Sequence, residues 1–420
     1  MNTIKRALFD QTVAATELLL HFQQPADAAL SAFFRAQRCG PRERGFIAET
    51  AYTVLRRLRS LRAWCGAEAA TRHLVLAALV RHGGVSQRML EGAISNRDAT
   101  WLSELRARPE PAMTLAEQTD FPDWLLDRLG SLMSGDELQL LARTLNQPAP
   151  LDLRVNAMKA ERASVLARLN QDGIAGVACT LAPAGIRLAG KPALAKYPLF
   201  LDGSIEVQDE GSQLLGHLVA PKRGEMVVDF CAGAGGKTLL LGALMRSTGR
   251  LYALDVSEKR LSKLKPRLAR SGLSNVHPVA IAHENDQRVK RLAGKCDRVL
   301  VDAPCSGLGT LRRNPDLKWR QTPQSIAELV VKQAGILAAA AKLLKPGGRL
   351  VYATCSLLPE ENSEIVDAFL SAHPGFARRP ASEILGNQGI KLDLAGPDLR
   401  LLPHVHGTDG FYAAVLERNA

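Results

Sequence analysis

Apolar residues in the first third of the chain recur at spacings of three and four, which is typical of amphipathic helices. Those that fall near one face are Phe33, Phe34, Phe46, Ile47, Ala51, Val54 and Leu55. Gly40-Pro41 is typical of a turn that opens a helix, and His82-Gly83-Gly84 of a helix end. We therefore predict an all-α bundle over residues 1–142.

The composition changes at residues 146–150, where two prolines lie close together and indicate a linker. After this linker, residues 151–155 read as a strand and residues 161–172 as a helix, and residues 177–200 carry weak strand signals. The pattern predicts a small α/β subdomain over residues 150–204.

From residue 205 onward, short apolar runs alternate with helical segments. The runs that predict strands are 226–230, 251–254, 276–281, 298–301 and 349–352. Helices are expected between them, including 257–270, kinked by Pro266, and 325–344. This alternation predicts a mostly parallel sheet with helices on both faces. Residues 400–403 and 410–417 are expected to add a C-terminal antiparallel hairpin, which completes a Rossmann-like domain over residues 205–420.

Composition narrows the class of protein. Apolar residues make up 46% and charged residues 23%, as in globular proteins. No apolar stretch is long enough for a bilayer and no signal peptide is evident, so we expect a cytoplasmic protein without membrane contact. The net charge of +12 favours a polyanionic partner. Seven scattered cysteines without a C-x-x-C pair argue against a metal site or a disulfide framework.

Residues 226–238 run from a strand through a glycine-rich loop into a helix. Such a loop alone could hold a nucleotide, a dinucleotide or S-adenosylmethionine, or be only a tight turn. The P-loop spacing fails because position 231 is Cys. Asp255 closes the second strand, where an acid can accept hydrogen bonds from ribose hydroxyls. Together with Asp229 it suits a cationic sulfonium ligand. Asp286 could reach an adenine edge or be a solvated loop carboxylate.

Two cysteines follow neighbouring predicted strands: Cys305 in Asp302-Ala-Pro-Cys305 and Cys355 in Thr354-Cys355-Ser356. The carboxyl ends of parallel strands meet at one rim, so both thiols could face one substrate. Addition of a thiolate to carbon 6 of a cytosine activates carbon 5 toward methylation. Asp302 could then hydrogen-bond N3, where charge builds. The residues alone leave open which thiol attacks.

The segment after Cys305 is rich in cations and holds an indole, a combination suited to phosphate contact and base stacking. We predict that its residues Arg312, Arg313, Lys318, Trp319 and Arg320 bind RNA. The alternative is a solvated loop anchored by a buried Trp319.

These motifs resemble the bacterial RNA cytosine-C5 methyltransferases, specifically the 16S rRNA enzymes of the Fmu/Sun family. The resemblance covers residues 205–412 and is strongest at 302–307, 312–320 and 352–356. It implies a class I methyltransferase domain, S-adenosyl-L-methionine as methyl donor, 16S rRNA as partner, Cys355 as nucleophile and Cys305 in product release. It assigns to the cofactor pocket Cys231, Ala232, Gly233, Ala234, Gly235, Gly236, Lys237, Asp255, Asp286 and Asp302.

The helical N-terminal region resembles the NusB-type RNA-binding domain that one branch of this family carries. One departure from the family lies in the loop, which reads Cys-Ala-Gly-Ala-Gly-Gly where many members have Cys-Ala-Ala-Pro-Gly-Gly. Alternative functions are methylation of tRNA or another rRNA site, or a non-catalytic RNA-binding or antitermination factor. The chain gives no reason to expect an obligate protein partner.

Overall fold

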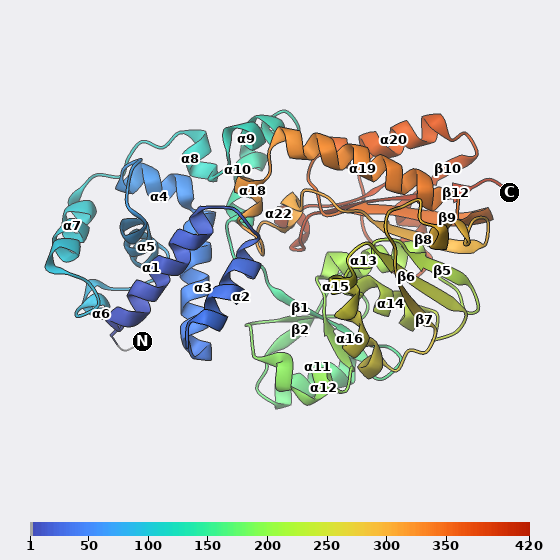
Figure 1. The fold of residues 1–420 in the computed structure, drawn as a ribbon, viewed down its shortest axis with the longest axis horizontal. Coiled ribbons are helices and arrows are strands. Elements are labelled where there is room, and N and C mark those ends of the chain that lie inside the picture. The colour runs from blue at the N-terminus through green and yellow to red at the C-terminus, as the bar shows by residue number, and fades with distance from the viewer. Residues whose placement is uncertain (1–2) are drawn as a thin grey trace. The chain divides into compact units, whose positions relative to one another are not determined.

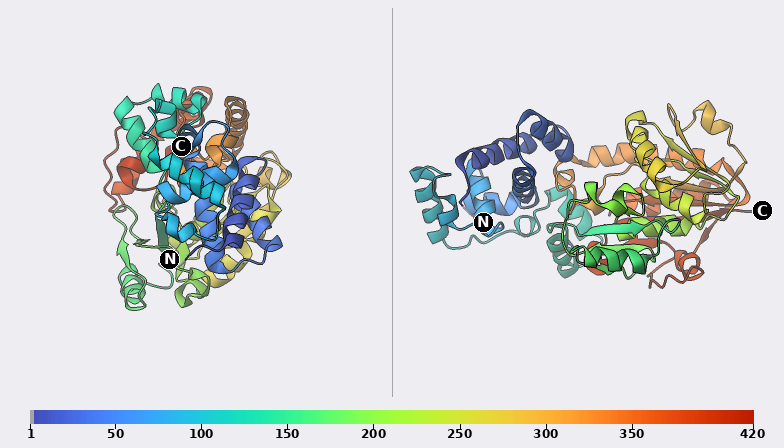
Figure 2. Two further views of the ribbon diagram at one scale, coloured as in Figure 1. Left: turned by 90° about the vertical axis from the view of Figure 1, so that its left-hand side faces the viewer. Right: turned by 90° about the horizontal axis from the view of Figure 1, so that it is seen from below.

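The computed structural model describes residues 3–420, which form two compact units (Figure 1). The helical unit comprises the residues up to Pro148 together with Thr310–Pro323, and the α/β unit comprises Ala149–Gly309 and Gln324–Ala420. Figure 2 gives two further views of the same elements. No helix within residues 3–420 has the length and apolar character needed to cross a membrane.

The helical unit confirms the expected all-α region. Its helices are α1 (Arg6–Leu20), α2 (Ala26–Ala36), α3 (Pro41–Arg56), α4 (Leu58–Cys65), α5 (Thr71–Arg81), α6 (Gln87–Leu90), α7 (Asn96–Ala107), α8 (Leu115–Thr119), α9 (Asp123–Gly130), α10 (Gly135–Leu145) and α18 (Leu317–Arg320). Helix α3 begins at Pro41, whose fixed φ suits a first helical turn. There Gly40 N donates to Glu43 Oε2 at 2.7 Å. Ile47 and Val54 are fully buried on the predicted apolar face.

A small antiparallel sheet opens the α/β unit. Its strands are β1 (Leu151–Val155), β2 (Gly176–Ala178), β3 (Gly185–Leu188) and β4 (Ile205–Val207), in the order β2-β3-β1-β4. Helix α11 (Arg162–Gln171), the 3-10 turn η1 (Leu194–Lys196) and helix α12 (Pro198–Leu201) complete it. Residues 205–207, which the sequence assigned to the next domain, pair with β1 instead, with Ile205 opposite Val155. The small sheet therefore extends past the expected boundary at 204.

The large sheet has the order β10-β12-β9-β8-β5-β6-β7, with β11 paired to β12. Its strands are β5 (Met226–Asp229), β6 (Arg250–Asp255), β7 (Val276–Ala280), β8 (Cys296–Asp302), β9 (Leu344–Thr354), β10 (Phe376–Arg379), β11 (Leu399–Leu401) and β12 (Phe411–Arg418). Strands β5 to β9 pair in parallel, whereas β12 pairs antiparallel with β9, β10 and β11. The Rossmann-like expectation with a C-terminal antiparallel element is confirmed.

Helices cover both faces of this sheet (Figure 1). One core contains side chains of α13 (Glu210–Val219), α14 (Gly236–Leu244), α15 (Glu258–Ser262), α16 (Leu264–Ser271) and α21 (Ala381–Gly386). The other contains side chains of α17 (Gln287–Lys290), α19 (Pro323–Ala341) and α20 (Ser363–Ala372). The helix expected over 257–270 is divided at Lys263, because Pro266 has no N–H for the carbonyl of Ser262.

Candidate active site

The functional residues gather at the carboxyl ends of β5, β6, β8 and β9. Strand β5 pairs with β6 on one side and β8 on the other, so the strand order reverses there. In open α/β sheets, ligands bind outside the strand ends at such a reversal. A cavity of about 660 Å³ lies here within the α/β unit, and its lining includes Cys231, Asp255, Asp302, Cys305 and Cys355.

The glycine-rich loop follows β5 and leads into α14. Its backbone is held to the sheet because Ala232 N donates to Leu254 O at 2.8 Å and Gly233 N donates to Asp255 Oδ2 at 2.8 Å. Gly235 has a φ of 82°, a conformation that favours glycine. The loop residues Cys231, Ala232, Gly233, Ala234, Gly236 and Lys237 line the cavity. Gly235 does not line the cavity; it is the N-cap residue of α14.

The acids near this loop have different surroundings. Asp255 lines the cavity, and its Oδ1 accepts hydrogen bonds from Ser257 N at 2.7 Å and Arg260 Nη2 at 3.1 Å. Asp229 is buried outside the cavity lining and accepts from Thr238 Oγ1 at 2.7 Å. Burial raises the pKa of Asp229 to about 7. Asp229 therefore stabilises the first turn of α14 instead of lining the pocket.

Asp286 does not reach the cavity, contrary to its sequence assignment. Its carboxylate caps α17, with Oδ1 accepting from Arg288 N at 2.8 Å and Oδ2 from Ala282 N at 2.9 Å. These backbone hydrogen bonds lower the pKa of Asp286. The acid that lines this part of the cavity is Glu284, which sequence reasoning missed. The loop after β7 contains both acids, and only its folding shows which one lines the cavity.

The two cysteine thiols come together as expected from their places after β8 and β9. Cys305 Sγ and Cys355 Sγ are 3.4 Å apart, and Cys355 N donates to Cys305 Sγ at 3.3 Å. The loops are joined by Gly309 N, which donates to Cys355 O at 2.8 Å. The side-chain hydrogen bond with Cys355, followed by burial, raises the pKa of the Cys305 thiol well above its ordinary value.

A salt bridge lies beside the thiols. Lys237 Nζ is 2.7 Å from Asp302 Oδ2. Burial acts to lower the pKa of Lys237, but the charge of Asp302 and the hydrogen bond to it outweigh burial, and the pKa is raised. A negative sulfur at Cys355 acts in the same direction, which means that the ammonium and the Cys355 sulfur interact electrostatically. The site thus combines two thiols, one ammonium and one carboxylate.

The segment expected to bind RNA packs instead as part of the helical unit. Lys318 is 1% exposed, and its Nζ donates to Arg56 O at 2.8 Å and to Asn146 Oδ1 at 3.0 Å. Trp319 Nε1 donates to Leu55 O at 2.8 Å. The backbone O of Arg312, a buried residue, accepts from Arg56 Nη2 at 3.2 Å. Burial lowers the pKa of Lys318 to about 7.

Lys318 and Arg312 are buried in this arrangement, and the hydrogen bond of Trp319 fits the alternative in which Trp319 anchors the loop. Arg313 and Arg320 are only partly buried. Arg320 Nη1 lies 3.4 Å from Asp316 Oδ2, and Asp316 also accepts from Ala26 N at 3.2 Å. Lys318 and Arg320 of this segment therefore take part in contacts within the helical unit.

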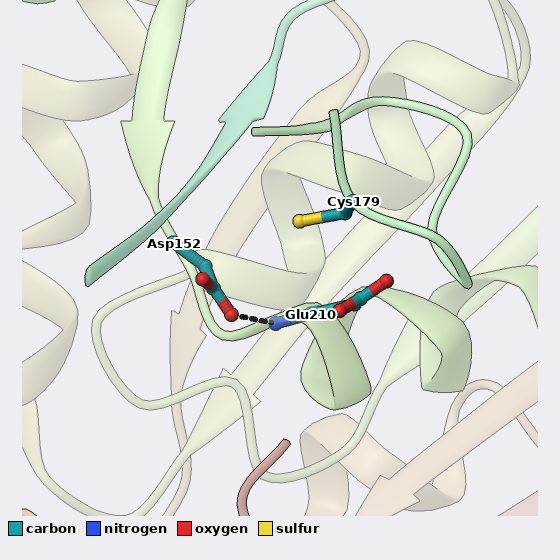
Figure 3. Close-up of side chains that lie close together, drawn as sticks. All are labelled: Asp152, Cys179 and Glu210. Carbon is teal, nitrogen blue, oxygen red and sulfur yellow. Dashed lines mark hydrogen bonds between the residues drawn. The ribbon is translucent and has the colours of Figure 1, made fainter. Parts of the chain in front are cut away.

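One buried cluster outside the cavity has metal-ligand chemistry: Asp152, Cys179 and Glu210 (Figure 3). Arg187 Nε and Nη2 donate to the two oxygens of Asp152 at 2.7 and 2.8 Å, and Nη2 is 3.3 Å from Glu210 Oε2. Glu210 Oε1 accepts from Leu181 N and Ala182 N. The Arg187 guanidinium already pairs with both carboxylates, so we interpret the cluster as a buried ionic network that joins the small sheet to α13.

Two family models match parts of this chain. A family model described as 16S rRNA methyltransferase RsmB/F matches residues 216–417. A second model, for the ferredoxin-like domain of RsmF/B-like methyltransferases, matches residues 121–195.

Individual relatives cover most of the chain. A probable ribosomal RNA small subunit methyltransferase B from Synechocystis is 39% identical over 307 residues, which is 73% of this chain and 68% of that protein. A probable ribosomal RNA small subunit methyltransferase B from Bacillus subtilis is 32% identical over 350 residues, covering 82% and 76%. The solved structure of PH0851 has a TM-score of 0.82 at 27% identity and covers 99% of both chains.

Proposed function

Because the chain belongs to the RsmB/F family of 16S rRNA methyltransferases, we propose that it methylates carbon 5 of a cytosine in 16S rRNA through a covalent bond to Cys355. The observation that carries this proposal is the separation of 3.4 Å between the Cys305 and Cys355 sulfurs at the rim of the cavity. A covalent route needs one group that attacks the base and a second group that assists release of the methylated base. Two thiols at one rim supply both.

The cavity suits S-adenosyl-L-methionine, which we propose as the methyl donor. Asp255 ends β6, where an acid can accept hydrogen bonds from ribose hydroxyls. Three donors already contact its carboxylate, those of Gly233, Ser257 and Arg260, and a carboxylate offers about four acceptor positions. Glu284 is a further acid in the lining. When bound, the donor supplies an electrophilic methyl group.

The chain's own residues supply the remaining chemistry. As a thiolate, Cys355 Sγ adds to carbon 6 of the cytosine, and the electrons displaced from the ring double bond activate carbon 5. The Lys237 ammonium, held by Asp302 at 2.7 Å, places positive charge beside the atoms on which negative charge builds. The target base must be unpaired or flipped, because a stacked pair hides carbon 6.

Release reverses the addition. After carbon 5 carries the methyl group, loss of its proton to a base re-forms the double bond between carbons 5 and 6 and expels the Cys355 thiolate. We assign Cys305 to this step because its sulfur lies beside the bond that breaks. The raised pKa keeps a proton on the Cys305 thiol. Cys305 can pass that proton to the departing Cys355 thiolate, 3.4 Å away, while it takes the proton that carbon 5 loses.

Methylation of unmodified 16S rRNA with radiolabelled S-adenosyl-L-methionine tests the proposal, and bisulfite sequencing locates the modified base. We expect no turnover by Cys355→Ser and a protein–RNA adduct on a denaturing gel with Cys305→Ala. Cys65→Ala, in the helical unit, serves as a control and should behave as wild type. Turnover by Cys355→Ser would remove Cys355 from the attacking role. Methylation of tRNA but not rRNA would overturn the substrate assignment.

A further inference from the structure

Glu361 is a fully buried carboxylate between the two cysteine loops. It ends the 3-10 turn η3 (Pro359–Glu361) and is 0% exposed. Its Oε1 accepts hydrogen bonds from Ser306 N at 2.8 Å and Gln333 Nε2 at 2.9 Å. Its Oε2 accepts from Ser306 Oγ at 2.5 Å and from Ser356 Oγ. The cysteine mechanism described above makes no use of this residue.

The donors to Glu361 belong to the loops that carry the thiols. Ser306 immediately follows Cys305, and Ser356 immediately follows Cys355. Gln333 Nε2 also donates to the carbonyl of Pro304, the residue before Cys305, at 3.0 Å. The turn itself is fixed to the sheet because Tyr352 OH donates to the backbone carbonyl of Glu361 at 2.7 Å. The Glu361 carboxylate therefore joins both loops, and the Glu361 backbone carbonyl ties the turn to strand β9.

The chemistry of the side chain explains why an acid occupies this position. Four donors converge on two oxygens, and an ionised carboxylate accepts at both oxygens whereas an amide accepts at only one. Burying an ionised group is costly unless hydrogen bonds replace its hydration, and here four neutral donors do so. The negative charge of Glu361 also helps to raise the pKa of the Cys305 thiol.

We propose that Glu361 is a positioning residue for the two-thiol reaction: by holding Ser306 and Ser356 it sets the distance between the Cys305 and Cys355 sulfurs. The link to turnover depends on the proposed function, whereas the distance itself does not. Glu361→Gln separates these effects. The glutamine side chain has one oxygen, which must stay at the Oε1 position to accept from the N–H groups of Ser306 and Gln333. Its NH₂ group then faces the two serine hydroxyls, so the two charge-assisted hydrogen bonds at the Oε2 position are lost.

The experiment measures the thiol spacing directly in the full-length chain. Hydrogen peroxide oxidises the two thiols to one disulfide, releasing two waters as peroxide is reduced, and mass spectrometry follows the Cys305–Cys355 peptide pair. We expect Glu361→Gln to slow this step and to lower kcat, each by about tenfold or more, because each of the two lost hydrogen bonds to a charged group is worth about a tenfold change. The affinity for S-adenosyl-L-methionine should stay unchanged. A general structural defect would lower this affinity as well.

The matched control is Glu364→Gln, which neutralises an exposed acid in the first turn of α20 and should behave as wild type in both assays. Disulfide formation by folded Glu361→Gln at the wild-type rate would overturn the proposal. If Glu361→Gln does not fold, Ser356→Ala removes one of the four donors and should slow disulfide formation in the same direction; no slowing would refute the proposal. A wild-type enzyme that forms the disulfide but no 5-methylcytosine would refute the proposed function instead.

Discussion

Gly235 lies at the base of the glycine-rich loop, and a single added methyl group there tests how that loop is held. Its φ is 82°, in the left-handed region. A Cβ atom on Gly235 would lie 2.2 Å from Leu264 Cδ1 and 2.9 Å from Leu264 Cγ. Leu264 is fully buried in the core between α16 and the sheet. Gly235→Ala must therefore displace either the loop or this core side chain.

The structure gives two additive costs. A left-handed conformation costs a residue with a Cβ about 1–2 kcal/mol, and forcing a methyl group into a packed site costs about 1–3 kcal/mol. The total is about 2–5 kcal/mol. Because about 1.4 kcal/mol equals a tenfold change in an equilibrium constant, displacement of the loop would weaken cofactor binding by about 30-fold to a few thousandfold. Displacement of Leu264 would instead lower the free energy of unfolding.

Calorimetric titration with S-adenosyl-L-methionine and chemical unfolding measure the two outcomes side by side. Gly224→Ala is the control, because Gly224 has a φ of 81° but open space around its Cβ position and lies outside the cavity lining. It should bind the cofactor as wild type and lose only the conformational cost of about 1–2 kcal/mol. The reasoning is refuted if Gly235→Ala keeps both wild-type affinity and wild-type stability.

Two further predictions concern corrected or newly explained residues. Asp255→Ala should weaken S-adenosyl-L-methionine binding at least tenfold in calorimetry. Asp286→Ala should leave the affinity unchanged and lower the free energy of unfolding, because the cap of α17 is lost; equal affinities for both variants would contradict this. Burial lowers the pKa of Lys318 from 10.5 to about 7, so between these pH values the unfolded chain holds the extra proton and stability rises with pH. Lys318→Met should flatten that rise in denaturation at pH 7 and pH 9, and an unchanged slope would exclude Lys318 as its source.

The α/β unit was predictable because its signals are local. Residues 226–230 and 298–301 are short apolar runs bounded by polar residues, and β5 (Met226–Asp229) and β8 (Cys296–Asp302) form there. Because parallel strands end at one rim, Cys305 and Cys355 were expected to meet although 50 residues separate them. The break at Lys263 follows equally from Pro266, since the missing N–H acts within one turn.

Residues whose roles depend on distant partners were not predictable. Lys318 and Trp319 donate to the backbone carbonyls of Arg56 and Leu55. Because every residue has a backbone carbonyl, the sequence does not show which carbonyls will accept these hydrogen bonds. The cations of 312–320 therefore looked like an exposed basic patch. Asp286 and Glu284 lie two positions apart in one loop, and only the formation of α17 decides which one caps the helix. Glu361 has donors on three elements, none of which marks it beforehand.

The unequal surroundings of the two thiols bear on which one attacks. The buried charge of Glu361 helps to raise the pKa of the Cys305 thiol and so opposes a thiolate at Cys305. The two sulfurs are 3.4 Å apart, so a proton on either one can be shared with the other. The resemblance of the motifs implies attack by Cys355 and release by Cys305, and this order stays a prediction that Cys355→Ser and Cys305→Ala test.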